Sequence, residues 1–226
     1  MKTTCSISRV VLLVALVISS EYVTAQDGSE LINAVAYQDL EKIKTLVEAG
    51  VDVNYKDENY GSTALIMSCQ YNFVDIAKYL IEAGADISIK SKFGNTALMA
   101  AARSSEELVN LLISKGADVS VKLEDGTSAF TLSIIGVLSD DIGFEVAEKL
   151  LENGADVDEK QVSGEAAGYT CLMMAARNQR PDIVNFLVEN GANVNAKAEN
   201  GNTPLSLAEE ENDLEMVALL KKLGAK

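Results

Sequence analysis

The chain repeats one short pattern along most of its length. The stretch "DIVNFLVENGANVN", which starts at Asp182, reappears with small changes as "DIAKYLIEAGADIS" from Asp75, "ELVNLLISKGADVS" from Glu107 and "EVAEKLLENGADVD" from Glu145. Each copy has an acidic residue, apolar residues at helical spacing, and then Gly-Ala-Asx. A helical unit copied at a regular interval predicts a solenoid, because no single unit can bury its apolar face alone.

The copies align on the glycine that ends each predicted helix. These glycines are separated by 34, 32, 38, 37 and 33 residues, and they are Gly50, Gly84, Gly116, Gly154, Gly191 and Gly224. We expect them to take the left-handed conformation that ends a helix. Five units open with a second signature, such as "GNTAL" from Gly94. The Thr or Ser in this signature has a side-chain hydroxyl that is placed to cap the first helix of the unit. The five capping residues are Thr63, Thr96, Ser128, Thr170 and Thr203.

These two signatures resemble the ankyrin repeat, whose pattern is G-x-T-P-L-H-x-A-A, a turn, a second helix and G-A-D-V-N. The clearest copy is "GYTCLMMAARNQRPDIVNFLVENGANVN", and the resemblance covers residues 30–226. It implies an all-α fold, an ankyrin-repeat α-solenoid of about six helix-turn-helix units joined by short β-hairpin arms. The domain is expected at 27–226, with units at about 27–57, 58–90, 91–122, 123–160, 161–197 and 198–226.

The two end units read as caps. The first unit lacks the Thr-x-Leu opening, and the last carries the acidic run Glu209 to Glu211. A solvated outer face of this kind keeps the end of a repeat array soluble. We therefore interpret the acidic run as a solubility feature rather than a ligand site.

The chain departs from the family pattern in two respects. The usual histidine is replaced at every unit, and the sequence contains no histidine. Two insertions also break the period. Residues 136–145 are expected to lengthen the link between the helices of unit four, and residues 158–170 the arm that follows. Insertions in repeat arrays map to loops, often on the binding side, and neutral drift in a tolerated loop is an equal alternative.

The first 25 residues have the pattern of a secretory signal peptide. Lys2 and Arg9 precede the apolar run "VVLLVALVI", and small residues lead to a predicted cleavage after Ala25. A membrane anchor would need about 20 apolar residues. The chain is therefore expected to be exported without membrane insertion. No Asn-x-Ser/Thr acceptor occurs in the sequence, which favours the periplasm over the extracellular alternative.

The cysteines are predicted to be free. Cys5 would leave with the signal peptide, so the mature chain keeps Cys69 and Cys171. Three helix layers put these roughly 25–30 Å apart if layers are about 8–10 Å thick, whereas a disulfide needs α-carbons within about 7 Å. We expect both to be buried thiols.

Charge and composition narrow the function. The formal net charge of −15 argues against a nucleic-acid partner, which needs clustered Lys and Arg, and fits a partner with a basic surface. Without histidine there is no Ser-His or Cys-His nucleophile and no imidazole zinc ligand. No phosphate-binding glycine loop or calcium loop is found. We predict no cofactor and no metal, and an enzyme is the least favoured reading.

The remaining prediction is that the chain binds another protein. The family resemblance implies a concave face made of arm tips and first helices. Its contact positions fall on Tyr37, Tyr60, Tyr71, Phe93, Arg103, Arg177 and Asn178. Tyr and Arg often dominate interface energies, although packing of a tyrosine ring on a neighbouring arm is an equal alternative. The chain is predicted to be a monomeric, exported module that inhibits, protects or scaffolds an extracytoplasmic protein. The alternative is a secreted effector that acts on a host or competitor protein.

Overall fold

Helices form in pairs, one pair for each predicted unit. The structure is a computed structural model that describes residues 28–162 and 167–226, so the predicted signal peptide lies outside the described residues. The first helices of the units are residues 28–36, α3 (Ala64–Gln70), α5 (Ala97–Ala101), α7 (Ala129–Leu138), α9 (Cys171–Arg177) and α11 (Pro204–Glu210). The second helices are α2 (Leu40–Glu48), α4 (Val74–Glu82), α6 (Glu106–Ser114), α8 (Glu145–Glu152), α10 (Pro181–Glu189) and α12 (Leu214–Lys222).

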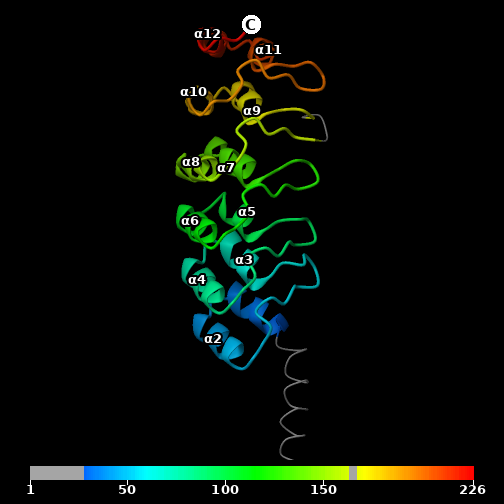
Figure 1. The fold of residues 1–226 in the computed structure, drawn as a ribbon, viewed down its shortest axis with the longest axis vertical. Coiled ribbons are helices and arrows are strands. Elements are labelled where there is room, and N and C mark those ends of the chain that lie inside the picture. Colours follow the sequence, from blue (N-terminus) through cyan, green and yellow to red (C-terminus); the bar gives the residue numbers. More distant parts are fainter. Residues whose placement is uncertain (1–27, 163–166) are drawn as a thin grey trace, which may run out of the picture.

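The pairs stack into one elongated array. Figure 1 shows the first helices in a central column, the second helices on one side and the connecting arms on the other. We call these the first arm (residues 51–62), the second (85–95), the third (117–127), the fourth (155–169, described without 163–166) and the fifth (192–202). The described part of the chain has no strand, only isolated bridges between Lys122 and Ser128 and between Lys160 and Thr170. The all-α solenoid is thereby confirmed.

The predicted caps are present at five first helices. In each, the hydroxyl oxygen of the N-cap residue accepts a hydrogen bond of 3.1 to 3.4 Å from the backbone N–H three residues on. The donors are Ile66, Met99, Thr131, Met173 and Ser206. Each bond satisfies an amide that the helix itself leaves free.

The helix-ending glycines have the expected backbone. Their φ angles lie between 89° and 101° at Gly50, Gly84, Gly116, Gly154, Gly191 and Gly224. Side chains disfavour this region, and glycine enters it without a steric cost. The chain can therefore turn out of each second helix into the next arm.

The main apolar core runs along the array. It extends from Leu31 in the first unit to Leu220 in the last. Fully buried alanines such as Ala102 and Ala176 allow neighbouring first helices to approach closely. Cys69 and Cys171 are buried free thiols, as expected. Burial raises the pKa of Cys69 to about 12.

Unit four differs from its neighbours. Helix α7 has 10 residues, and it takes in residues 136–138 of the first insertion. The expectation that this insertion lengthens only the link was therefore incomplete, because buried Gly136 and Val137 extend the helix. Phe130 and Ile134 are fully buried, at positions where unit three has Leu98 and the small Ala102.

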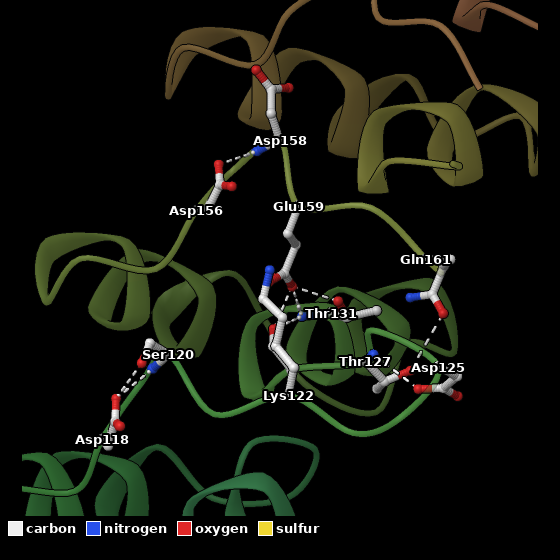
Figure 2. A network of polar contacts seen from close by, with 11 residues as sticks. Asp118, Ser120, Lys122, Asp125, Thr127, Thr131, Asp156, Asp158, Glu159 and Gln161 are labelled. Atoms are coloured by element: carbon white, nitrogen blue, oxygen red, sulfur yellow. Dashed lines mark hydrogen bonds and ion pairs between the residues drawn. The ribbon is translucent and has the colours of Figure 1, made fainter. Parts of the chain in front are cut away.

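A buried carboxylate from the fourth arm lies at the start of α7. The Glu159 side chain is 3% exposed and accepts hydrogen bonds from the hydroxyls of Ser128 and Thr131 and from the Thr131 N–H at 3.1 Å. The ammonium group of Lys122 lies 3.4 Å from its other oxygen. Figure 2 shows this carboxylate directed at the helix with Lys122 beside it. A negative charge is favourable there because the N-terminal end of a helix carries a partial positive charge.

A cation from unit five lies at the other end of α7. The Arg180 guanidinium donates to the carbonyls of Val137 and Leu138 at 3.0 and 3.1 Å. It also pairs with Asp140 and Asp182, and its hydrogen bond to Asp182 lowers the pKa of that carboxyl. Glu159 of the fourth arm and Arg180 of unit five thus place opposite charges at the two ends of α7, each with the sign that matches the helix dipole.

Candidate functional site

Exposed aromatic side chains gather on the arms and at the ends of the first helices. Tyr60 and Phe93 lie near the tips of the first and second arms and are 62% and 65% exposed. Tyr71 and Tyr37 follow the first helices of units two and one and are 58% and 85% exposed. These four are the aromatic residues that the sequence assigned to the site, and their rings are accessible to a partner.

Tyr60 and Phe93 form one aromatic patch. Their ring centroids are 6.3 Å apart and the rings are tilted by 45°, within the range of favourable aromatic pairs. The Lys92 N–H donates to the Tyr60 carbonyl at 2.8 Å, which joins the two arms. The structure therefore brings together two residues that lie 33 positions apart in the sequence.

Hydrogen bonds within each arm hold these tips. The Asp57 carboxylate accepts from the N–H groups of Asn59, Tyr60 and Ser62 at 2.6 to 2.9 Å. In the second arm, the Ser91 hydroxyl accepts from the N–H of Phe93 at 3.3 Å. A tip that is ordered before binding loses less conformational entropy when a partner docks.

The other two aromatic positions lie apart from this pair. Tyr71 is the C-cap of α3, and its ring stacks on Phe73 with centroids 5.7 Å apart. Tyr37 comes directly after helical residues 28–36. Both lie where a first helix turns toward its second helix, so they belong to the link side of the column.

The three polar candidates differ in their freedom to bind. Arg103 is exposed, and its side chain has no hydrogen bond or ion pair within residues 28–162 and 167–226. Arg177 lies 3.8 Å from Glu211. The Asn178 amide donates to the Met174 carbonyl at 2.8 Å, so it serves as a cap of α9. Among these three, Arg103 is the one whose charge faces solvent unpaired.

The sequence analysis missed Glu159, Arg180 and Val162. Glu159 stands where the other arms carry Tyr55, Ile89, Val121 and Ala196, so a charge at an otherwise apolar position was a usable signal. Arg180 is the N-cap residue of α10 without a side-chain cap bond. Val162, on the fourth arm, is 58% exposed, and no repeat signature marks it.

The described residues hold no metal-binding cluster. Residues 28–162 and 167–226 contain no group of His, Cys, Asp and Glu that could hold a metal ion. Within the same ranges, no helix is both long and apolar enough to cross a bilayer. Glu159, the buried carboxylate, has its acceptor positions occupied by the protein's own donors.

The fold and the exposed patch together define a class of protein. An array of stacked helix pairs that presents ordered arms and accessible aromatic rings is a repeat scaffold for recognition. Residues 31–122 and 137–226 match the family model of ankyrin repeats (3 copies). The chain belongs to the ankyrin repeat family. Ankyrin repeat domains are in general protein-binding modules without catalytic activity.

Two known proteins illustrate the similarity. The crystal structure of the human ASB11 ankyrin repeat domain superposes with a TM-score of 0.70 and 32% sequence identity, over 87% of this chain and 84% of that chain. Human BCL-6 corepressor-like protein 1 is 44% identical over 59 residues, which are 26% of this chain. The match spans only 3% of the length of that relative.

Proposed function

We propose that this chain is an exported binding module that holds an extracytoplasmic protein partner, which it inhibits, protects or scaffolds. The observation that carries the proposal is the exposed aromatic patch of Tyr60 and Phe93 on the first two arms, with Tyr37 and Tyr71 also exposed at the ends of first helices. Buried aromatic anchors supply much of the binding energy at protein interfaces. The proposal also includes Arg103, Arg177 and Asn178, the polar contact positions that the family resemblance implies in units three and five.

The charge supports a partner with a basic surface and a monomeric chain. The sequence carries 34 acidic residues against 19 basic ones. Two copies of such a chain repel each other, whereas a cationic protein is attracted at long range. The signal-peptide pattern of residues 1–25 supports export. Without an Asn-x-Ser/Thr acceptor, the periplasm is the compartment we propose.

The test is a pull-down from the extracytoplasmic fraction of the native producer, with the tagged chain as bait and mass spectrometry as readout. Replacing Tyr60, Tyr71 and Phe93 by Ala should release the partner, because each anchoring residue is worth on the order of 2 kcal/mol. Leu214→Ala is the matched control. Leu214 is 80% exposed but lies on the terminal helix α12, away from the arms, and its loss should leave binding unchanged.

Three outcomes would count against parts of the proposal. Loss of helix content in the triple variant would mean that the rings are structural. Equal capture of the partner by the wild type and the triple variant would show that these aromatic residues do not contribute to binding. Recovery of the protein mainly from culture medium, with capture only from host or competitor extracts, would replace the periplasmic proposal by the effector alternative.

A further inference from the structure

A side-chain hydrogen bond at equivalent positions joins several arms to the unit that follows. The acceptor lies four positions after a helix-ending glycine, and the donor is the backbone N–H two positions after the next such glycine. The acceptor and donor pairs are Asn54 and Asp86 at 2.8 Å, Asp158 and Asn193 at 2.9 Å, and Asn195 and Lys226 at 2.9 Å. This bond fixes the spacing between one arm and the next unit.

The junction between the second and third arms lacks this bond. Ser88 occupies the acceptor position, and its hydroxyl donates to Asp86 of the same arm at 2.6 Å. The equivalent donor, the Asp118 N–H, has no hydrogen bond to residues 28–162 or 167–226. The hydroxyl of serine is carried on Cβ, so it reaches one bond less far than the side-chain oxygen of asparagine. A serine at this position therefore leaves the two arms unjoined here.

The third arm also has a serine at this position, but other contacts join it to the fourth arm. The N–H and the hydroxyl of Ser120 donate to Asp118 of the same arm at 2.8 and 2.6 Å, as Figure 2 shows. The Val162 N–H, however, donates to the Asp125 carbonyl at 2.7 Å. Buried Glu159 of the fourth arm also accepts a hydrogen bond from the start of α7. The loss of the repeated bond is therefore offset at this junction.

The second and third arms have no such replacement. No hydrogen bond or ion pair joins residues 85–95 to residues 117–127, all of which the structure describes. The fourth and fifth arms, by comparison, have an additional bond, because the Lys160 ammonium group donates to the Lys197 carbonyl at 3.0 Å. Polar contacts therefore join the other neighbouring arms and are missing at this one place in the described array.

A cavity lies where the contact is missing. Its volume is about 260 Å³, and its lining includes Ser88 and Lys90 of the second arm, Asp118 and Val121 of the third, and Leu98 of α5. Side chains that face such a space have no partner atoms across it, so they lose the dispersion contacts of a packed surface. Neither polar bonds nor close packing hold the two arms together at this point.

The helices of the same two units remain in contact. The main apolar core includes Leu98 of α5 together with Phe130 and Ile134 of α7. A Cβ at Gly136 of α7 would lie 3.7 Å from the Cα of Arg103, which follows α5. Contact between the helices and a gap between the arms describe a joint that is held on one side and open on the other.

We propose that the junction between units three and four is a hinge, and that Ser88 is the residue that leaves it free. Units one to three, with the aromatic patch, move as one body, and units four to six move as another. The packed helices α5 and α7 form the pivot, because parts of a protein with few buried contacts open at the lowest free-energy cost. Bending widens or closes the cavity and changes the distance from the aromatic patch to the third arm. The hinge is a property of the free chain and does not require the proposed partner.

The test measures distances between nitroxide labels in the full chain by pulsed electron paramagnetic resonance. The labels are attached to genetically encoded p-acetylphenylalanine, so the native cysteines need no change. One pair of labels, at Glu58 and Glu124, spans the proposed hinge, and the matched pair, at Glu124 and Glu199, does not. All three glutamates are exposed, and their side chains have no hydrogen bond or ion pair within the described ranges. Each pair spans two junctions between arms, so the widths of the two distance distributions are comparable.

We expect the distribution for the pair at Glu58 and Glu124 to be about twofold wider than the distribution for the matched pair. Ser88→Asn should supply the missing acceptor for the Asp118 N–H and narrow the wider distribution to the width of the other. Ser120→Asn is the control, because it makes the same change one arm later. It should leave the width for the pair at Glu58 and Glu124 as in the wild type.

Equal widths for the two pairs in the wild type would overturn the hinge without any variant. A distribution for Glu58 and Glu124 that stays wide in a folded Ser88→Asn variant, or that Ser120→Asn narrows equally, would overturn its assignment to this junction. Circular dichroism verifies that both variants keep the helix content of the wild type. Neither outcome depends on whether a partner is found, so failure of the hinge is separate from failure of the proposed binding function.

Discussion

Single residues set the ends of the helices in this array. A hydroxyl begins each first helix after the first unit, and a glycine with positive φ follows each second helix. Both effects act within four residues along the chain, so they were predictable from sequence alone. The accessible rings at Tyr60 and Phe93 were predictable as tip residues. Their pairing was not, because it depends on how two arms stack.

Substitutions of Gly84 test whether the left-handed backbone at the end of a second helix requires glycine. Its φ is 92°, and a Cβ at Gly84 would meet nothing within 4 Å, so a substitution there strains the backbone without a clash. Gly84→Val should lower the free energy of unfolding by about 1–2 kcal/mol. Gly84→Asn should cost less, because Asn tolerates the left-handed region. Urea denaturation followed by circular dichroism compares them, and equal losses in both variants would contradict this account.

At the scale of an element, helix α7 shows how one unit departs from the repeat. Phe130 and Ile134 enlarge its buried face. Glu159 of the fourth arm lies at its start, and Arg180 of unit five lies at its end. A bulky first helix limits close packing with the small-residue helices beside it. Charged hydrogen bonds from Glu159 and Arg180 hold the two ends of α7.

The thiol of Cys171 can serve as a probe of the contact between Glu159 and α7. It is buried in α9, and burial followed by the charge of Glu159 raises the pKa of its thiol. Cys69, buried in α3 of unit two, is an internal reference far from Glu159. Glu159→Gln puts an amide donor among hydrogen-bond donors, which should cost about 1–3 kcal/mol locally. We therefore expect a thiol reagent to label Cys171 faster in this variant while Cys69 is labelled at the wild-type rate.

Glu152→Gln is the control for this experiment. Glu152 is 65% exposed and pairs with Lys149 on the surface, and such pairs contribute little to stability. It should leave both labelling rates unchanged. If Glu159→Gln instead increases the labelling rates of Cys69 and Cys171 equally, the array opens as one unit. The contacts of Glu159 would then not stabilise its surroundings locally.

For the whole molecule, the array distributes charge and apolar surface unevenly. The aromatic patch lies on the first two arms, and the acidic excess lies in residues 123–226. A long array with an acidic field attracts a cationic partner from a distance, and the exposed rings add short-range contact. The two effects act at different stages, because electrostatics sets the association rate and buried anchors set the dissociation rate.

This division makes a prediction about salt. With the partner recovered in the pull-down, raising NaCl from about 50 to 500 mM should slow association severalfold and change dissociation little, because salt screens exposed charges beyond roughly 10 Å. Surface plasmon resonance measures both rates, and circular dichroism at each salt concentration verifies that the array remains folded. Association that is independent of salt would exclude electrostatic steering.

The sequence by itself determined the class of fold, the number and order of the helix pairs, the caps and the helix-ending glycines. These depend on short-range bonding and on a repeated apolar pattern, which the chain carries in every unit. It also indicated the exposed aromatic residues. Tertiary structure alone decided that residues 136–138 extend α7, that Glu159 and Arg180 hold the two ends of that helix, and that the Val162 N–H bonds to the Asp125 carbonyl. These contacts join residues 28 to 43 positions apart in sequence, or depend on the register between arms. They become visible only when the units are stacked.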